Sequence, residues 1–330
     1  MGIQMTNIKE KPDPEDTSPP VLIGVSACLL GEKVRFDGNH KRDTYICDTL
    51  GEYFQFVPVC PEVAIGLGVP RPTIRLIGDP QAPHAVGVLN PELDVTSKLQ
   101  QYSRRAAREL PMLSGFLLKS KSPSCGMERV KIYQDKGVPK LGRGLFAQAL
   151  IQARPLLPVE EEGRLGDPAL RENFIERVFA YHRWRQLEQR GITPARLVDF
   201  HARHKLVLMS HGAEYYRALG RLVADAGKDA IKSRARQYIE AFMDALRHPA
   251  TRKRHANVLQ HLMGYLKKSL DGADKSELLA LIDAYRLGQI PLIVPVTLLK
   301  HHFRRHPHSY VEQQIYLEPH PKELMLRNHI

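Results

Sequence analysis

The segment VLIGVSACLLG (residues 21–31) joins an apolar run to Cys28, and the chain repeats this arrangement twice. QFVPVCPE (55–62) places Cys60 after a second apolar run, and GFLLKSKSPSCG (115–126) places Cys125 after a third. Short apolar runs bounded by turn residues are typical of buried strands. Because ligands bind beyond the carboxyl ends of the strands in an open parallel sheet, we expect the three thiols to converge on one point.

The residues around these segments alternate between the strand and helix patterns. We predict a short amphipathic helix over 48–56 and an Asp-capped helix over 94–110. Further strands are expected at TIRLIGD (73–79), AVGVLN (85–90), KIYQ (131–134) and PLLPV (155–159), and a further helix at GRGLFAQALIQAR (142–154). Strands that alternate with helices predict an α/β domain over residues 20–160, with a mostly parallel, Rossmann-like sheet.

The pattern changes after the acidic, Gly-containing stretch EEEGRLGDP (160–168). Asp167 followed by Pro168 is typical of a helix start, and Gly191 is typical of a helix end. A second helix is expected to start at Thr193-Pro194, and further helices are predicted over 211–226, 229–247, 251–270 and 274–287. Residues 165–330 therefore read as an all-α domain, with the tail YVEQQIYLEPHPKEL (310–324) expected on its surface.

The composition is that of a globular protein, with 43% hydrophobic and 25% charged residues among 330. Residues 1–19 are polar, contain prolines and carry no secretory signal, so we expect a disordered leader. No apolar run is long enough to span a bilayer, and no membrane partner is expected. Four widely spaced cysteines without an export signal predict reduced thiols and a cytoplasmic location.

The net charge of +12 lies mostly in the second half of the chain, which carries +8 from residue 156 onward. Such a field favours polyanions, including nucleic acid. An ordinary solvated surface remains the alternative for any single cation. The candidate nucleic-acid contacts are Arg217, Arg221, Lys232, Arg234, Arg236, Arg252, Lys253, Arg254, Lys267 and Lys268.

The aromatic and histidine residues of the second half are each compatible with two roles. Trp184, Tyr215 and Tyr216 could stack a base or pack a core. His201 and His204 are spaced as metal ligands can be, but no carboxylate or cysteine pattern completes such a site. We expect the histidines to be structural or to face phosphate.

The thiols of the three cysteine loops are soft ligands that select zinc, copper(I) or iron–sulfur clusters. A structural zinc site takes four ligands, usually in close pairs, and no CxxC occurs here. Cys47 is expected to be a buried structural residue. Glu62 is placed to move protons beside a metal, or to cap a helix or form a salt bridge. Ser122 and Ser124 are placed to orient a substrate or to cap loop amides.

These motifs resemble the thiouracil desulfidase family known as TudS. The resemblance lies in SACLLGEKVRFDG (26–38), PVCPEVAIGLGVPRP (58–72), the helix that begins DVT at 94, and LLKSKSPSCG (117–126). The second half is similar to YbgA-type domains in LVDFHARHKLVLMSH (197–211), TRKRHANVLQHLMGYLKK (251–268), YRLGQIPLIVPVTLLKHH (285–302) and the tail. The whole chain resembles the fused RudS-type desulfidases, which are associated with removing sulfur from 4-thiouridine in tRNA.

The resemblance implies a [4Fe-4S] cluster with Cys28, Cys60 and Cys125 as ligands and one open iron. It also implies catalytic roles for Glu62 and Ser122, and none for Cys47. The implied reaction is a non-redox hydrolysis through a [4Fe-5S] intermediate that gives uridine and sulfide and needs no redox partner. The implied partner is tRNA that contains 4-thiouridine, with the YbgA-like domain as its platform.

Two alternatives stay open. The same chemistry could act on free thiouracil or on 4-thiouridine monophosphate. Alternatively, the protein binds nucleic acid, carries a structural or sensory metal site and catalyses no reaction. This alternative requires Cys47 as a fourth metal ligand.

Overall fold

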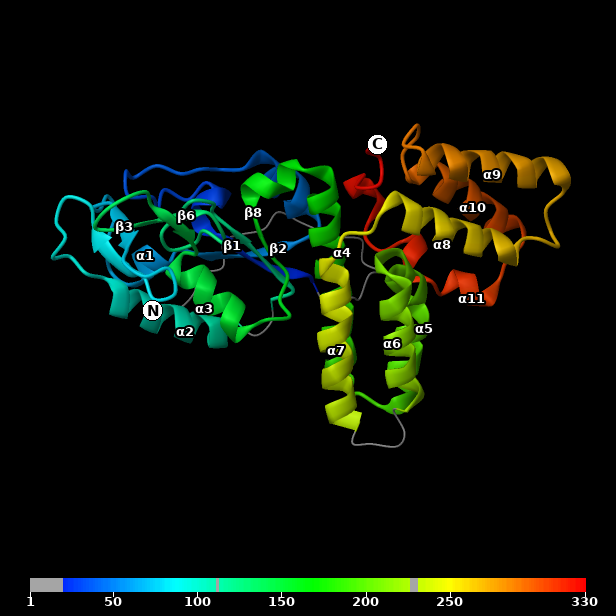
Figure 1. The fold of residues 1–330 in the computed structure, drawn as a ribbon, viewed down its shortest axis with the longest axis horizontal. Helices are drawn as coiled ribbons and strands as arrows, with labels where there is room; N and C mark the ends of the chain where they lie inside the picture. Colours follow the sequence, from blue (N-terminus) through cyan, green and yellow to red (C-terminus); the bar gives the residue numbers. More distant parts are fainter. Residues whose placement is uncertain (1–19, 111–112, 226–230) are drawn as a thin grey trace. The chain divides into compact units, whose positions relative to one another are not determined.

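A computed structural model describes residues 20–110, 113–225 and 231–330 (Figure 1). The chain divides into two compact units between Leu165 and Gly166. The leader expected over residues 1–19 lies outside the described residues. Each unit is described by itself.

The first unit contains a parallel sheet in the order β2-β1-β5-β8. Its strands are β1 (Leu22–Ser26), β2 (Gln55–Val59), β5 (Gly115–Leu118) and β8 (Val159–Glu161). The α/β prediction is confirmed. Gly24 in β1 pairs with Val57 on one side and with Phe116 on the other. A Cβ atom at Gly24 would lie 2.3 Å from the Phe116 ring, so the glycine lets the ring pack against the strand.

A second sheet has the order β4-β3-β6-β7, with β3 parallel to β6 and the other pairs antiparallel. Its strands are β3 (Ile74–Ile77), β4 (His84–Gly87), β6 (Val130–Tyr133) and β7 (Lys140–Gly142). Leu76 and Ile132 from the sheet and Leu99 from the following helix are fully buried together. The sequence pattern predicted one sheet, because its alternation does not show which strands pair.

Three helices accompany the sheets: α1 (Pro61–Ala64), α2 (Thr96–Glu109) and α3 (Leu145–Ala153). Asp94 accepts a hydrogen bond from the Thr96 amide at 2.8 Å, but it lies one residue before the N-cap position of α2, which is Val95 and has no side-chain cap. The helix predicted over 48–56 is wrong. Short irregular helical turns at Tyr45–Thr49 and Leu50–Glu52 replace it. The strand predicted at 155–159 is also displaced, because β8 starts only at Val159.

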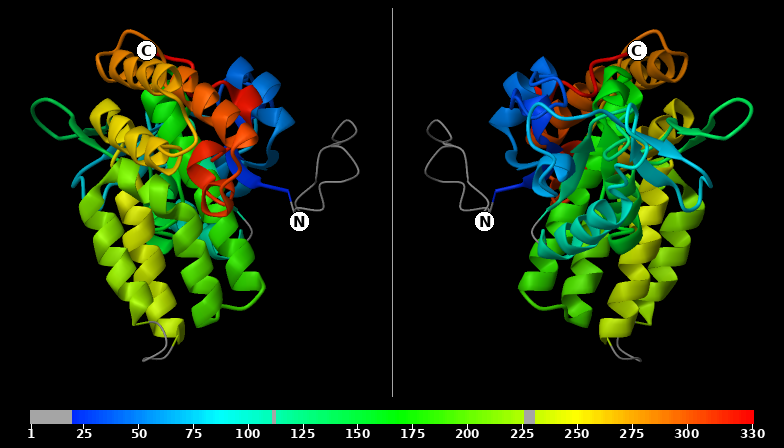
Figure 2. Two further views of the ribbon diagram at one scale, coloured as in Figure 1. Left: turned by 90° about the vertical axis from the view of Figure 1, so that its right-hand side faces the viewer. Right: turned by 90° about the vertical axis from the view of Figure 1, so that its left-hand side faces the viewer.

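The second unit is helical, which confirms the predicted class. Asp167 accepts hydrogen bonds from the Ala169 and Leu170 amides, and Thr193 caps the next helix through the Arg196 amide. Helices α6 and α7 lie side by side (Figures 1 and 2). The helices are α4 (Pro168–Gln189), α5 (Pro194–His211), α6 (Ala213–Ala224), α7 (Ile231–Arg247), α8 (Arg252–Tyr265), α9 (Gly272–Arg286), α10 (Ile293–Arg305) and α11 (Ser309–Glu312).

The core of this unit contains Trp184, which is 1% exposed and stacks on Tyr238 at 5.7 Å between ring centroids. Trp184 is therefore a packing residue. The tail was expected on the surface, and this is wrong, because Tyr316 is fully buried and Val311 is 1% exposed. Prolines in the tail break regular structure without preventing its side chains from entering the core.

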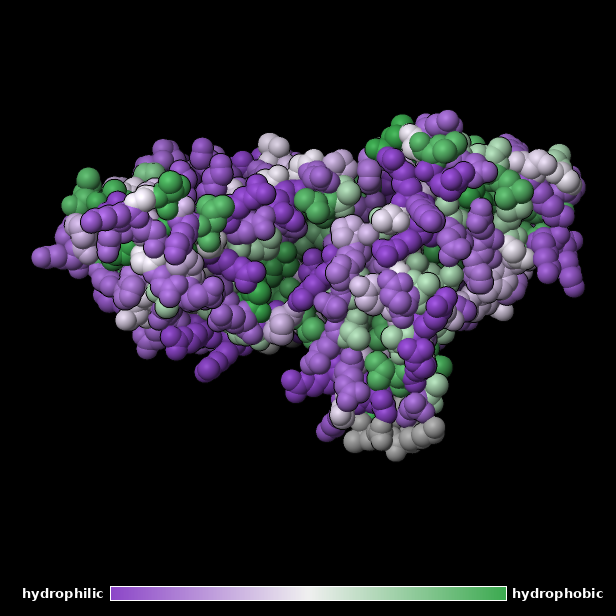
Figure 3. All heavy atoms as spheres, viewed as in Figure 1, coloured by the Kyte–Doolittle hydropathy of each residue, from purple (hydrophilic) through white to green (hydrophobic). Residues whose placement is uncertain are grey.

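Within the described ranges, no helix combines the length and the apolar character needed to cross a bilayer. Most of the surface in view in Figure 3 is hydrophilic, with hydrophobic side chains in small groups.

Candidate active site

The three cysteines follow neighbouring strands of the parallel sheet. Cys28 lies in a 3-10 turn (Ala27–Leu30) directly after β1. Cys60 is the residue between β2 and α1, and Cys125 lies in the loop after β5. Because β2, β1 and β5 are adjacent and parallel, their carboxyl ends meet at one edge. The predicted convergence of Cys28, Cys60 and Cys125 is thereby explained by the topology.

All three cysteines line one cavity of about 570 Å³. Among the described residues, no three His, Cys, Asp or Glu side chains lie close enough to hold a single metal ion. Cys47 does not line the cavity, and its thiol contacts the Leu29 carbonyl oxygen at 3.4 Å.

Burial controls the ionisation of the cavity thiols. It raises the pKa of Cys28 to about 11, with a further contribution from Cys60, and it raises the pKa of Cys60. The pKa of the buried Cys125 is raised well above its ordinary value for the same reason. A coordinating metal deprotonates a thiol outright, so metal binding would reverse these shifts.

Among the described residues that line the cavity, Glu62 is the only acidic one. Each of its two carboxylate oxygens has a hydrogen-bond donor. Arg71 donates to Oε2 from Nε at 2.9 Å and approaches it from Nη2 at 2.8 Å. Ser124 donates to Oε1 at 2.8 Å. The Arg71 side chain is only 4% exposed, and its Nη1 is held by the Val34 carbonyl oxygen at 2.8 Å. These contacts fix the carboxylate at the cavity wall.

The two serines of the third cysteine loop differ in their contacts. Ser122 lines the cavity, and its Oγ accepts hydrogen bonds from the Ser124 and Cys125 amides at 3.2 and 3.1 Å. Ser124 is fully buried and contacts Glu62. Sequence reasoning left the orienting and capping roles open for both residues. The loop gives Ser122 the capping contacts and Ser124 the contact with the carboxylate.

Sequence reasoning missed two groups at the cavity. Arg71 lies in the Gly- and Pro-rich segment GLGVPRP (66–72), where a cation before proline was the only available signal. Lys119 lines the cavity and pairs with Glu162, which also accepts hydrogen bonds from the amide and hydroxyl groups of Ser120. The partners Lys119 and Glu162 are far apart in sequence, so no local pattern could join them.

The cavity is basic. Arg35, Lys41, Arg71, Lys119 and Lys121 all line it. Lys41 and Lys121 are exposed, and the ring of Phe36, which is 40% exposed, forms part of the wall.

The ten candidate nucleic-acid contacts lie in the second unit. Arg217 and Arg221 are on α6, Lys232, Arg234 and Arg236 are on α7, Arg252, Lys253 and Arg254 are on α8, and Lys267 and Lys268 follow α8. All are exposed except Arg234 and Arg254, which are half-buried. Arg236 pairs with Glu240 at 3.0 Å, and Arg254 pairs with Glu214 at 3.7 Å. Their contact with nucleic acid stays a prediction.

Two family models match this chain, one within each of its two units. Residues 23–162 match a family model described as 2-thiouracil desulfurase. Residues 205–321 match one described as a protein of unknown function (DUF1722).

Relatives match each part separately. The uncharacterized protein YbgA of Escherichia coli (strain K12) is 37% identical over 158 residues, which are 48% of this chain and 94% of YbgA. The uncharacterized protein YbbK of Bacillus subtilis (strain 168) is 30% identical over 146 residues, which are 40% of this chain and 91% of YbbK. A solved structure described as the [4Fe-4S]-dependent thiouracil desulfidase TudS is 34% identical, with 44% of this chain and 94% of that chain covered and a TM-score of 0.37. The chain thus belongs to the 2-thiouracil desulfurase family through residues 23–162, and carries in its second unit the domain that it shares with YbgA.

Proposed function

We propose that this protein is an iron–sulfur-dependent desulfidase that removes sulfur from 4-thiouridine in tRNA and releases uridine and sulfide. The observation that carries the proposal is the cavity at one edge of the parallel sheet, where three thiols and the fixed carboxylate of Glu62 come together. Family membership supports the desulfidase chemistry.

The donor set fits an iron–sulfur cluster. Cys28, Cys60 and Cys125 are soft ligands, and thiolates hold such clusters in proteins. They line one cavity of about 570 Å³, and no three described His, Cys, Asp or Glu side chains form a single-ion site. With Cys47 outside the cavity, a cluster held here would supply an iron that lacks a protein ligand and can bind the sulfur of a thiocarbonyl group.

The chain's own residues supply the proton chemistry. In the proposed reaction, one water and one C=S group give one C=O group and hydrogen sulfide, so no electrons are gained or lost. Glu62 takes a proton from the attacking water and returns it to the departing sulfur. Arg71 binds Oε2 of Glu62 and Ser124 binds Oε1, and these contacts fix the orientation of the carboxylate at the cavity. Ser122 lines the cavity, and in the proposed reaction its hydroxyl group orients the thiolated nucleobase.

Two features of the cavity wall support a nucleotide or polynucleotide over a free base. Lys41 and Lys121 are exposed cations that can meet phosphate groups. The half-exposed ring of Phe36 offers a face on which a pyrimidine can stack. In the second unit, the basic residues of α6, α7 and α8 form the proposed platform for the remainder of the tRNA.

The test is anaerobic incubation of cluster-loaded protein with tRNA that contains 4-thiouridine, followed by the loss of the thiobase absorbance. Parallel reactions use 4-thiouridine monophosphate and free 4-thiouracil. Turnover of the small substrates alone would show that tRNA is the wrong substrate. An intact cluster with no turnover of any thiobase would refute the desulfidase proposal. Loss of iron binding when Cys47 is replaced would favour a structural metal site.

A further inference from the structure

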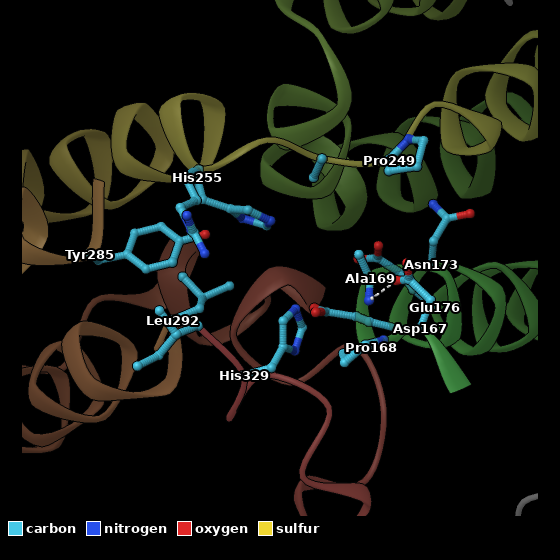
Figure 4. Close-up of a pocket in the computed structure, with 14 residues that line it drawn as sticks. Asp167, Pro168, Ala169, Asn173, Glu176, Pro249, His255, Tyr285, Leu292 and His329 are labelled. Carbon is cyan, nitrogen blue, oxygen red and sulfur yellow. Dashed lines mark hydrogen bonds between the residues drawn. The ribbon is translucent and has the colours of Figure 1, made fainter. Parts of the chain in front are cut away.

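The acidic side chains near the start of α4 are paired within the protein. Glu172 and Glu176 line a cavity of about 350 Å³ (Figure 4). Arg327 lies 3.1 Å from the carboxylate of Glu172 and 3.9 Å from that of Glu176, and His211 approaches Glu176 at 3.1 Å. The contacts of these groups therefore join α4 to α5 and to the segment that carries Arg327.

Lys205, on α5, lies among aromatic rings instead of carboxylates. Its Nζ is 5.2 Å from the ring centroid of Tyr216 on α6 and 5.6 Å from that of Tyr310 on α11. Burial opposes the charged form of Lys205, whereas the neighbouring Tyr216, Tyr310 and Tyr265 raise its pKa. Within the described part of the chain, no carboxylate forms an ion pair with Lys205, so its positive charge is not neutralised there.

A third tyrosine extends this aromatic surface. Tyr265, at the end of α8, packs against Tyr310 with ring centroids 5.5 Å apart and against His308 with centroids 4.7 Å apart. The tyrosines and the lysine are half-buried, so each of these side chains keeps part of its surface in contact with solvent. We refer to Lys205, Tyr216, Tyr265 and Tyr310 as the tyrosine–lysine cluster.

His201 supports one ring of the cluster and adds no charge to it. Its ring is stacked on Tyr216, with the two planes 5° apart and the centroids 6.0 Å apart. Its Nδ1 is hydrogen-bonded with the Tyr238 hydroxyl group at 3.2 Å, which fixes the imidazole. Burial, together with the nearby charge of Lys205, lowers the pKa of His201 to about 4, so the ring is neutral at pH 7.

Cations from the sequence-based candidate set lie next to the cluster along the chain. Arg217 and Arg221 are on α6 with Tyr216, and Lys267 and Lys268 follow the end of α8. All four cations are exposed. Aromatic rings beside a cation that has no counter-ion, with further positive charge around them, are what proteins use to bind unpaired nucleic acid.

We propose that the tyrosine–lysine cluster binds an unpaired nucleotide of RNA, with a tyrosine ring stacked on the base and Lys205 facing a phosphate group. Every base has a face that can stack, so the site accepts a loop or an end of the RNA without requiring a defined sequence. A paired helix offers phosphate groups but keeps its bases stacked inside. The choice of tRNA as the RNA rests on the proposed function, whereas the preference for an unpaired nucleotide rests on the cluster.

The test is a fluorescence anisotropy titration of labelled tRNA with cluster-loaded full-length protein, repeated at several salt concentrations under anaerobic conditions. The variants are Tyr265→Ala, Tyr265→Phe and Lys205→Gln, and a fully paired RNA duplex is the control ligand. The matched control for the lysine is Lys275→Gln, because Lys275 on α9 is also half-buried but lies over no aromatic ring in the described part of the chain.

Tyr265→Ala should weaken tRNA binding by about tenfold, because base stacking is lost, and Tyr265→Phe should restore it. Neither variant should change the affinity for the duplex. Lys205→Gln should make the slope of log K against log salt concentration shallower by about one, and Lys275→Gln should not.

Unchanged tRNA binding by Tyr265→Ala would overturn the proposal, even if the melting temperature of this variant falls, because the ring would then serve packing alone. An equal loss of tRNA and duplex binding in Tyr265→Ala, or equal effects of Lys205→Gln and Lys275→Gln, would overturn it as well. Failure of the proposed function would instead appear as no loss of thiobase absorbance, which the binding titration does not measure.

Discussion

Arg71→Ala removes the cation that holds the proposed proton-transfer group. Arg71 approaches Oε2 of Glu62 with two nitrogens, at 2.9 and 2.8 Å, and binds the carbonyl oxygens of Val34 and Gly68 with a third. The two side chains are 4% and 14% exposed, so little water can replace the lost contacts. Removing one partner of a buried ion pair costs about 3–5 kcal/mol. Because a domain is usually stable by about 5–15 kcal/mol, the variant should fold but melt at a lower temperature.

The effect on catalysis should exceed the effect on substrate binding. A catalytic group displaced by ~1 Å loses about 100-fold in rate, so kcat of Arg71→Ala should fall by about that factor while KM changes little. Arg71→Lys keeps the charge but not the planar set of donors, and should recover about tenfold of the loss. Ser124→Ala, which frees the other oxygen of Glu62, should lower kcat in the same direction.

The assay is anaerobic desulfuration of 4-thiouridine, with iron and sulfide measured in each preparation. Arg42→Ala is the matched control, because Arg42 binds Asp48 with both terminal nitrogens and does not line the cavity. The positioning role is refuted if Arg71→Ala retains the wild-type kcat with a full cluster. It is also refuted if Arg71→Lys is no more active than Arg71→Ala at equal iron content.

Three further outcomes are expected. Cys125→Ser should abolish iron binding, whereas Cys47→Ser should retain it, because only Cys125 faces the cavity; equal iron loss in both variants would point to a four-ligand site. Phe36→Ala should raise KM for 4-thiouridine monophosphate by about tenfold, since base stacking is worth about 1–3 kcal/mol, and an unchanged KM would exclude stacking on this ring. Burial lowers the pKa of His204 and His255 to about 3, so only the unfolded chain takes up their protons as pH falls below 6.5. The free energy of unfolding should then decrease by about 1 kcal/mol per pH unit for each histidine between pH 6 and 4, and denaturant titrations showing no such decrease would contradict their burial as neutral rings.

The convergence of the cysteines could be foreseen because it depends on a short-range signal. Each apolar run is a strand, and parallel neighbours end at the same edge, so Cys28 and Cys60 fall together. The identity of the serine beside Glu62 could not be foreseen. Ser122 and Ser124 differ by two positions, and only the path of the loop decides which hydroxyl reaches the carboxylate.

The limits of the sequence signal are clearest where contacts join distant segments. The partners Lys119 and Glu162 are 43 residues apart, and the strand that brings Glu162 to the site begins at Val159 rather than at 155. Tyr316 lies in a polar, proline-containing tail, yet it is fully buried because its hydroxyl bonds His255 and its carbonyl oxygen bonds Arg327. Periodicity reports on one element at a time and carries no information on such pairs.

The two kinds of group at the active site are held in different ways. The cysteines Cys28 and Cys60 lie directly at strand ends, where the sheet limits their movement. Glu62 is positioned instead by Arg71 and Ser124, which come from two separate loops. A change in the segment that carries Arg71 can therefore redirect the carboxylate without moving the thiols, whereas Ser124 shares its loop with Cys125. Under the proposed function, the strand ends position Cys28 and Cys60 for a cluster, and Arg71 and Ser124 position the carboxylate that would take a proton from water. Variants of Arg71 and variants of Cys125 should consequently separate activity from iron content.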